Sequence, residues 1–170
     1  MKIVLLFLLF PVLIFGQSPL KEADQLFEHK QFIKAEQLLS AYVDSNPDDL
    51  KAIERLGDAY GHQLKWNEAI SQYRFLVRSD GNNANFHYKY GGALGMKALS
   101  ISKIRAVGLI GDIKRAFLRA AELDPQHIDT RWALVELYIQ LPGIIGGSKK
   151  KSLHYAQELE DLSKVDGYLA

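Results

Sequence analysis

Positions 50–81 carry the pattern that most restricts what this chain can fold into. Each half of this stretch places apolar and small residues at helical spacing on one face, which predicts two amphipathic helices joined by a turn. These positions are Ile53, Leu56, Gly57 and Tyr60 in the first half and Ala69, Ile70, Tyr73 and Leu76 in the second. Small residues such as Gly57 and Ala69 let two helices approach closely, so we expect the two halves to form one helical hairpin.

The hairpin pattern recurs along the chain with a period of about 34 residues, and two helices per unit at this period are the signature of tetratricopeptide repeats. Ala35 takes the place of Ala69 one period earlier, and Asn46-Pro47 takes the place of Asp80-Gly81. The chain resembles that family at Gly57, Tyr60, Ala69, Tyr73 and the sequence AELDP at 121–125.

The resemblance implies an all-α fold, an α-solenoid of antiparallel helical hairpins with about four units. One hairpin cannot bury its apolar face alone, whereas stacked hairpins share a continuous core. We therefore expect one helical repeat domain over residues 17–170. Its units are predicted at about 20–46, 50–80, 84–125 and 128–165.

The period fails in the last two units. About ten residues are added within Met96–Asp112, where apolar residues keep nearly helical spacing and three basic residues are interspersed. This insertion is interpreted either as two lengthened helices or as a helix that docks on a membrane surface or a partner. About five residues are added at 141–151, where we expect Ile144 and Ile145 to fold back onto the core. The sequence PGIIGGSKKK in this loop also resembles a segment of exported bacterial tetratricopeptide proteins of unassigned role.

Residues 1–16 have the features of a secretory signal peptide. Lys2 precedes thirteen residues that are apolar except for one proline, and Gly16 is the expected last residue before cleavage. The alternative is an uncleaved anchor, but the apolar run is shorter than the roughly 20 residues of a spanning helix. We expect an exported protein, periplasmic or secreted, with no stable membrane insertion after cleavage.

Composition argues against several classes of function. The 21 Lys and Arg nearly balance the 20 Asp and Glu, so no long-range field attracts nucleic acid. The absence of cysteine excludes disulfides, thiolate nucleophiles, Cys-based zinc sites and a lipid-modified amino-terminal Cys. The five histidines are scattered, and no HExxH or GxSxG motif occurs. We expect no enzymatic activity, no catalytic residue, no metal site and no cofactor.

The expected binding surface is the concave groove that the first helix of each hairpin lines in this family. Alignment to the family's groove positions predicts an acidic surface over the first units and an aromatic one over the last. The predicted groove residues are Asp24, Phe27, Glu54, Asp58, His62, Tyr88, Met96, Trp132 and Glu136. Such a surface suits an extended protein segment with basic and apolar side chains. For Tyr88 and Trp132 the alternative is packing between hairpins.

One partner class of the family is not expected here. Members that hold the carboxyl-terminal tails of chaperones use Lys, Asn and Arg in the groove. This chain has Leu20 and Asp24 at those places in the first unit, and Glu54 and Asp58 in the second. The carboxylate clamp is absent, and the identity of the protein or peptide partner stays open.

Two further hypotheses concern other parts of the chain. Residues 166–170 have the pattern of a further hairpin's start, so the solenoid could stack with itself or within an envelope assembly through an uncapped end. Lys149, Lys150 and Lys151 follow Ser148 in a first helical turn, where the helix dipole disfavours positive charge. Together with free backbone amides they form a candidate site for an anion or a lipid headgroup.

Overall fold

The computed structural model describes residues 18–169, and this range is helical without any strand. The signal peptide predicted for residues 1–16 lies outside the described residues. No helix in the described range is both long and apolar enough to cross a membrane. The helices are α1 Pro19–Glu28, α2 Phe32–Ser45, α3 Leu50–His62, α4 Trp66–Ser79, α5 Ala84–Ser100, α6 Lys103–Leu123, α7 Ile128–Gln140, the short 3-10 helix η1 Gly143–Ile145, α8 Lys149–Leu162 and α9 Lys164–Leu169.

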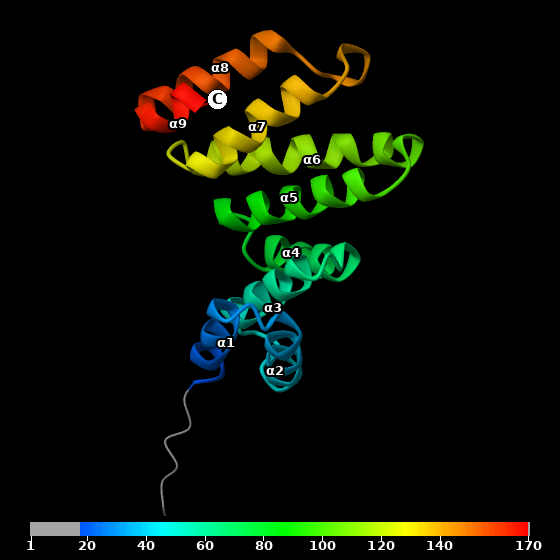
Figure 1. The fold of residues 1–170 in the computed structure, drawn as a ribbon, viewed down its shortest axis with the longest axis vertical. Helices are drawn as coiled ribbons and strands as arrows, with labels where there is room; N and C mark the ends of the chain where they lie inside the picture. Colours follow the sequence, from blue (N-terminus) through cyan, green and yellow to red (C-terminus); the bar gives the residue numbers. More distant parts are fainter. Residues whose placement is uncertain (1–17, 170) are drawn as a thin grey trace, which may run out of the picture.

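Consecutive helices pair into four hairpins, α1–α2, α3–α4, α5–α6 and α7–α8, which we number 1 to 4 (Figure 1). The hairpins stack one on the next along the long axis of the molecule, and α9 turns back to pack against α8. First helices also meet directly, since α1 contacts α3 and α5 contacts α7. The all-α stack of helical hairpins predicted from the sequence period is therefore confirmed.

The turns of hairpins 1 and 2 repeat the same local structure. Lys30 and Leu64 both have left-handed backbone conformations, with φ of 55° and 59°, and they lie one repeat period apart. The amide of Gln31 donates to the carbonyl of Leu26 at 2.8 Å, and that of Lys65 donates to Tyr60 at 3.0 Å. These two hydrogen bonds are separated by the same period, so the period of the sequence is also a period of the backbone.

Close helix contacts explain where small residues stand in the core. Ala35 and Ala69 are both fully buried. A Cβ atom added at Gly57 would lie 2.6 Å from Tyr73 Cε1, and one added at Gly91 would lie 2.9 Å from two ring carbons of Phe117. In both cases an aromatic ring of the second helix occupies the space that a side chain on the first helix would need.

The insertion in hairpin 3 lengthens both of its helices. α5 has 17 residues and α6 has 21, compared with 13 and 14 in α3 and α4. The end of this hairpin projects sideways beyond its neighbours (Figure 1). The inserted residues therefore extend both helices of hairpin 3, as the first of the two interpretations predicted. A docking role for the projecting end stays a hypothesis.

The insertion in hairpin 4 forms a closed loop, and the prediction that Ile144 folds back onto the core is wrong. Ile144 is 95% exposed, and Ile145 is only partly buried. The loop folds on its own backbone: the amides of Ile145 and Gly147 both donate to the carbonyl of Pro142, at 3.0 and 3.1 Å. Ile144 lies at the apex of this turn, where its side chain faces solvent.

Candidate functional site

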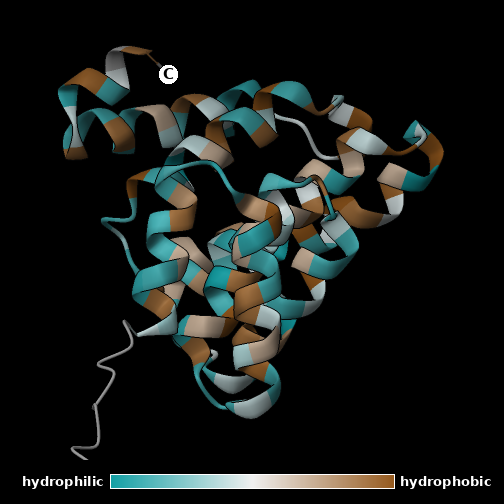
Figure 2. Cartoon of the chain, turned by 60° about the horizontal axis from the view of Figure 1, so that its bottom comes forward, coloured by the Kyte–Doolittle hydropathy of each residue, from teal (hydrophilic) through white to brown (hydrophobic). Residues whose placement is uncertain are grey.

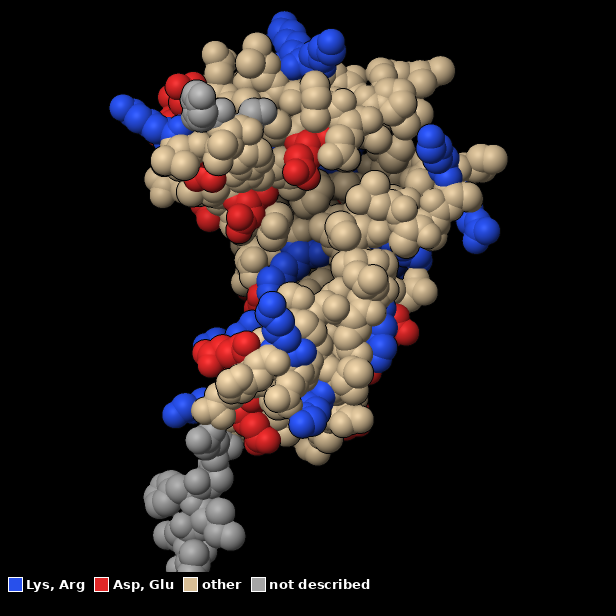
Figure 3. Space-filling model, in the orientation of Figure 1, with Lys and Arg blue, Asp and Glu red and all other residues tan. Residues whose placement is uncertain are grey.

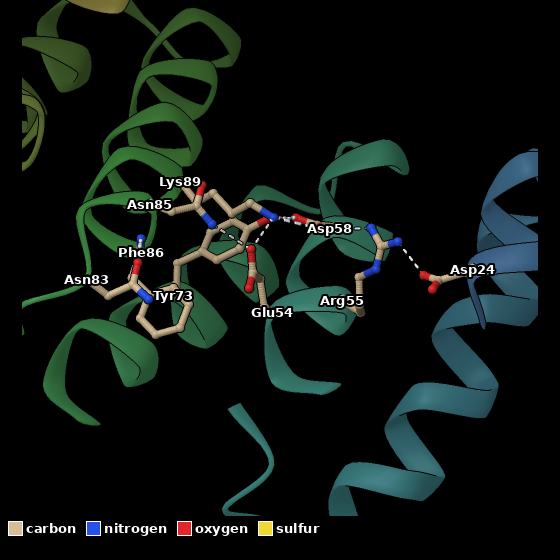
Figure 4. A network of polar contacts seen from close by, with 9 residues as sticks. All are labelled: Asp24, Glu54, Arg55, Asp58, Tyr73, Asn83, Asn85, Phe86 and Lys89. Atoms are coloured by element: carbon tan, nitrogen blue, oxygen red, sulfur yellow. Dashed lines mark hydrogen bonds and ion pairs between the residues drawn. The ribbon is translucent and has the colours of Figure 1, made fainter. Parts of the chain in front are cut away.

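The first helices of hairpins 1, 2 and 3 enclose a pocket of about 300 Å³. Charged side chains from all three helices meet there, and most of them are drawn in Figure 4. The lining residues are Leu20, Asp24, Lys51, Glu54, Arg55, Asp58 and Lys89. Three of the predicted groove residues, Asp24, Glu54 and Asp58, are thus brought together, and we call this surface the charged groove.

Lys89 of α5 holds the two carboxylates of α3. Its Nζ lies 2.7 Å from Glu54 Oε1 and 2.7 and 2.8 Å from the two oxygens of Asp58. Asn85, one turn earlier on α5, donates to Glu54 Oε1 at 2.7 Å. The side chains of Lys89, Glu54 and Asp58 are 22%, 21% and 15% exposed, so solvent screens these ion pairs only in part.

A second link joins α3 to α1, where Arg55 donates to the carboxylate of Asp24. These two side chains are 39% and 50% exposed, and the pair is more open to solvent than the Lys89 pairs. Arg55 also lies 3.6 Å from Asp58 and places its guanidinium 5.0 Å from the ring centre of Phe27. The side chains therefore connect three consecutive hairpins along one surface.

The links share one sequence spacing. Asp24 to Arg55, Glu54 to Asn85 and Asp58 to Lys89 are each 31 residues apart. This spacing is the repeat period of 34 residues less about one helical turn. The structure thus shows a ladder of polar contacts between α1, α3 and α5.

The ladder corrects the prediction of an acidic surface over the first units. Three cations face three carboxylates in the charged groove, so its formal charge is balanced. The hydroxyl of Tyr73 on α4 also donates to Asp58 at 2.7 Å. Burial raises the pKa of Tyr73, and the nearby carboxylate of Asp58 adds to this, so the phenol stays protonated as a donor.

Phe27 and His62 lie in an aromatic cluster beside the charged groove. The ring of His62 stacks on Phe32 at 4.1 Å with an interplanar angle of 3°. Phe27 meets both rings edge-on at 5.7 Å. These contacts join α1, α2 and α3, so apolar packing also links the first two hairpins.

Tyr88 and Trp132 make contacts between hairpins, which was the alternative to a groove role. The Tyr88 ring lies 6.1 Å from Phe117 of its own hairpin and 5.1 Å from His127, which caps α7 of the next hairpin. Trp132 Nε1 donates to Asp166 Oδ1 of α9 at 3.0 Å. Hydrogen bonds from Ser163 and Trp132 lower the pKa of Asp166.

Met96 and Glu136 are the two remaining predicted groove residues. Met96 is 44% exposed near the end of α5, and Glu136 is exposed on α7. Neither lines the charged groove, which is enclosed by α1, α3 and α5. Their role in binding stays a prediction.

The candidate anion site at Ser148–Lys151 begins α8. Ser148 Oγ accepts the amide of Lys151 at 3.3 Å and caps the helix. All three lysines are exposed, and Lys151 also places its ammonium 5.2 Å from the ring centre of Tyr138. The turn therefore directs one lysine back along α7 and leaves Lys149 and Lys150 facing solvent. Whether this turn holds an anion stays a hypothesis.

Three residues of the charged groove, Lys51, Arg55 and Lys89, were not predicted from the sequence. Alignment to family positions selects side chains of single helices, but these cations matter through partners in neighbouring hairpins. A spacing of 31 residues between residues of opposite charge would have found Arg55 and Lys89. Among residues 18–169, no group of three or more His, Asp or Glu side chains is placed to hold a metal ion.

Comparison with known proteins identifies the architecture. No protein-family model matches the chain, and neither does any curated protein sequence. The crystal structure of TTC0263, a thermophilic TPR protein in Thermus thermophilus, superposes with a TM-score of 0.72 at 17% identity, covering 87% of this chain and 74% of that one. MamA superposes with a TM-score of 0.66 at 20% identity, covering 86% and 78% of the two chains.

A third similar structure belongs to a much larger protein. The O-GlcNAc transferase of Thermobaculum terrenum superposes with a TM-score of 0.66 at 21% identity over 84% of this chain. The match spans only 25% of that transferase. At these identities the likeness concerns architecture alone, and it agrees with the repeat period seen in both sequence and backbone. The chain has the tetratricopeptide-repeat fold.

Proposed function

We propose that the chain is a non-enzymatic binding module that holds an extended segment of a partner protein in the charged groove. The observation that carries this proposal is the pocket itself, which three consecutive hairpins line with three cations and three carboxylates. A surface of fixed, alternating charges on rigid helices can orient a peptide through several polar contacts at once.

The accessible members of the charged groove define the segment that fits. Glu54, Asp58 and Lys89 satisfy one another at 22% exposure or less, and breaking them apart would leave partly buried charges unpaired. Lys51 is exposed, and the paired side chains of Arg55 and Asp24 are 39% and 50% exposed, so two cations and one carboxylate are open to a ligand. The groove therefore suits a segment with acidic side chains rather than the basic segment expected from the sequence.

The proposed location is outside the cytoplasm. It rests on residues 1–16, whose short positive start and apolar run are typical of a cleavable signal peptide. Expression of the full chain in a bacterial host, followed by mass measurement of the protein from the periplasm, tests this. The expected product begins at Gln17, and a full-length product retained in the membrane would contradict the proposal.

Site-specific crosslinking tests the groove. The chain has no cysteine, so Lys51→Cys carries a single thiol for a photo-crosslinker in the groove. Lys34→Cys is the matched control, because Lys34 is an exposed lysine on α2, the second helix of hairpin 1. We expect a discrete crosslinked protein from position 51 and not from position 34 in native envelope extracts.

A competition experiment distinguishes specific binding in the groove from random collisional crosslinking. An excess of the unlabelled chain should suppress the crosslink at position 51, and an excess of a Lys51→Glu chain should suppress it less. Lys51→Glu reverses one of the two accessible cations without touching the core. Equal crosslinking from positions 51 and 34, or equal competition by both chains, would contradict a groove that binds acidic segments.

A further inference from the structure

Two projecting segments combine exposed apolar residues with positive charge only. Residues 96–111 end α5 and begin α6, and residues 141–151 connect α7 to α8; together we call them the tip surface. They contain six lysines and arginines and no Asp or Glu, although the whole chain has 21 basic and 20 acidic residues. Both segments lie on the same side of the stack (Figure 1).

The start of α6 has an apolar outer face. Ile104 is 89% exposed and Val107 is 50% exposed, and the next positions on this face are the exposed Gly108 and Gly111. Lys103 and Arg105 flank this strip on its two sides, by the helical spacing of about 100° per residue. A helix face in water normally carries polar side chains, so this face is suited to an apolar environment bordered by anions.

The end of α5 and the loop before α8 add to this surface. Leu99, near the end of α5, is 74% exposed, and Ile144, in η1, is 95% exposed. In Figure 2, brown apolar segments alternate with hydrophilic ones at the projecting end where α5 meets α6. The loop before α8 lies close to a side chain of α6, since a Cβ atom added at Gly146 would lie 2.8 Å from Lys114 Nζ.

Positive charge is found on the same projecting segments as the exposed apolar residues. On the face drawn in Figure 3, the projecting end of α5 and α6 carries blue and tan atoms without red ones, and the red atoms lie elsewhere. Lys103, Arg105, Lys149 and Lys150 are all exposed. Their ammonium and guanidinium groups can reach phosphates that lie beside an apolar layer.

We propose that the tip surface docks on a lipid membrane that carries anionic headgroups. Leu99, Ile104 and Ile144 enter the boundary between headgroups and acyl chains, and the flanking cations contact lipid phosphates. A second copy of this chain would bring the same uncompensated cations together, which like-charge repulsion opposes. A lipid surface supplies the anions and the apolar layer together, and it adapts to two separate projections. The charged groove on α1, α3 and α5 takes no part, so this inference is independent of the proposed function.

Single labelled cysteines test the docking locally. Full-length Ile104→Cys and Ile144→Cys chains carry one thiol each for a polarity-sensitive fluorophore, since no native cysteine competes. Ile33→Cys is the matched control, because Ile33 is 63% exposed on α2 in hairpin 1. The vesicles are phosphatidylcholine alone or an equimolar mixture with phosphatidylglycerol. The apolar residues 1–16 are common to all variants, so a local change at the labelled position separates docking from capture through that segment.

The expected result is a blue shift at positions 104 and 144 with anionic vesicles, a weaker one with phosphatidylcholine, and none at position 33. Replacing Lys97, Lys103 and Arg105 by Gln should weaken binding by on the order of a hundredfold, and added salt should weaken it too. No shift at positions 104 and 144 would overturn the proposal. So would equal shifts at all three positions, or a shift that depends on protein concentration without vesicles, which would indicate self-association.

Discussion

Replacing Gly91 by Ala tests the close contact between α5 and α6. The new Cβ would lie 2.9 Å from Phe117 Cδ1 and Cε1 and 3.1 Å from Ala116 Cβ. Phe117 is only 6% exposed, and its ring cannot move away without disturbing the core. Overpacking of this kind costs about 1–3 kcal/mol of unfolding free energy, and Ala in place of Gly in a helix returns about 1 kcal/mol. The net expectation is a loss of about 0–2 kcal/mol.

Gly92→Ala is the matched control on the same helix. A Cβ atom at Gly92 meets nothing within 4 Å, so only the propensity gain of about 1 kcal/mol applies. The difference between the two variants cancels this gain and isolates the packing cost. We therefore expect Gly91→Ala to be less stable than Gly92→Ala by about 1–3 kcal/mol.

Urea unfolding followed by circular dichroism measures both variants. The midpoint should fall for Gly91→Ala and rise for Gly92→Ala, with an unchanged slope that shows unfolding of the same surface. Adding Phe117→Leu to Gly91→Ala should give a favourable coupling of about 0.5–3 kcal/mol, because the two residues touch. If Gly91→Ala is as stable as Gly92→Ala, the steric explanation for this glycine is refuted.

Three further predictions concern other parts of the chain. Lys89→Met should lower the unfolding free energy, measured by urea unfolding, by about 1–3 kcal/mol, because it removes the cation from two partly buried carboxylates. The control Lys34→Met, on the exposed face of α2, should change this free energy by less than about 0.5 kcal/mol. Leu64→Gly should raise the thermal midpoint through a gain of about 0.5–1 kcal/mol, because Leu64 has a φ of 59°, and an unchanged or lower midpoint would contradict this. The lowered pKa of Asp166 contributes stability that is present above about pH 4 and is lost as the pH falls through the folded value. In a Trp66→Phe chain the fluorescence of Trp132 should therefore change below about pH 4, and Asp166→Asn should abolish that change.

The repeat could be predicted from sequence because its signals are local. Apolar spacing, small residues and turn residues recur with one period, and the backbone follows them at Lys30 and Leu64. The insertion in hairpin 3 kept its helical spacing and therefore lengthened two helices. Ile144 was placed wrongly because apolar character predicts burial, whereas the loop's own backbone hydrogen bonds put this residue at the apex.

The charge of the groove could not be predicted from one helix at a time. Glu54 and Asp58 are acidic by themselves, but Lys89 from the next hairpin pairs with both of them at 2.7 Å. Which residues meet across hairpins depends on how successive first helices pack against each other. Residues whose role lies in such cross-hairpin contacts need the structure to be found.

The difference in exposure between the two rungs of the polar ladder has a mechanical consequence. The Asp24–Arg55 rung is 39–50% exposed, whereas the Lys89 rungs are 15–22% exposed. Dissolved ions weaken the open rung first, so we expect salt to loosen the polar link between hairpins 1 and 2 before the links between hairpins 2 and 3.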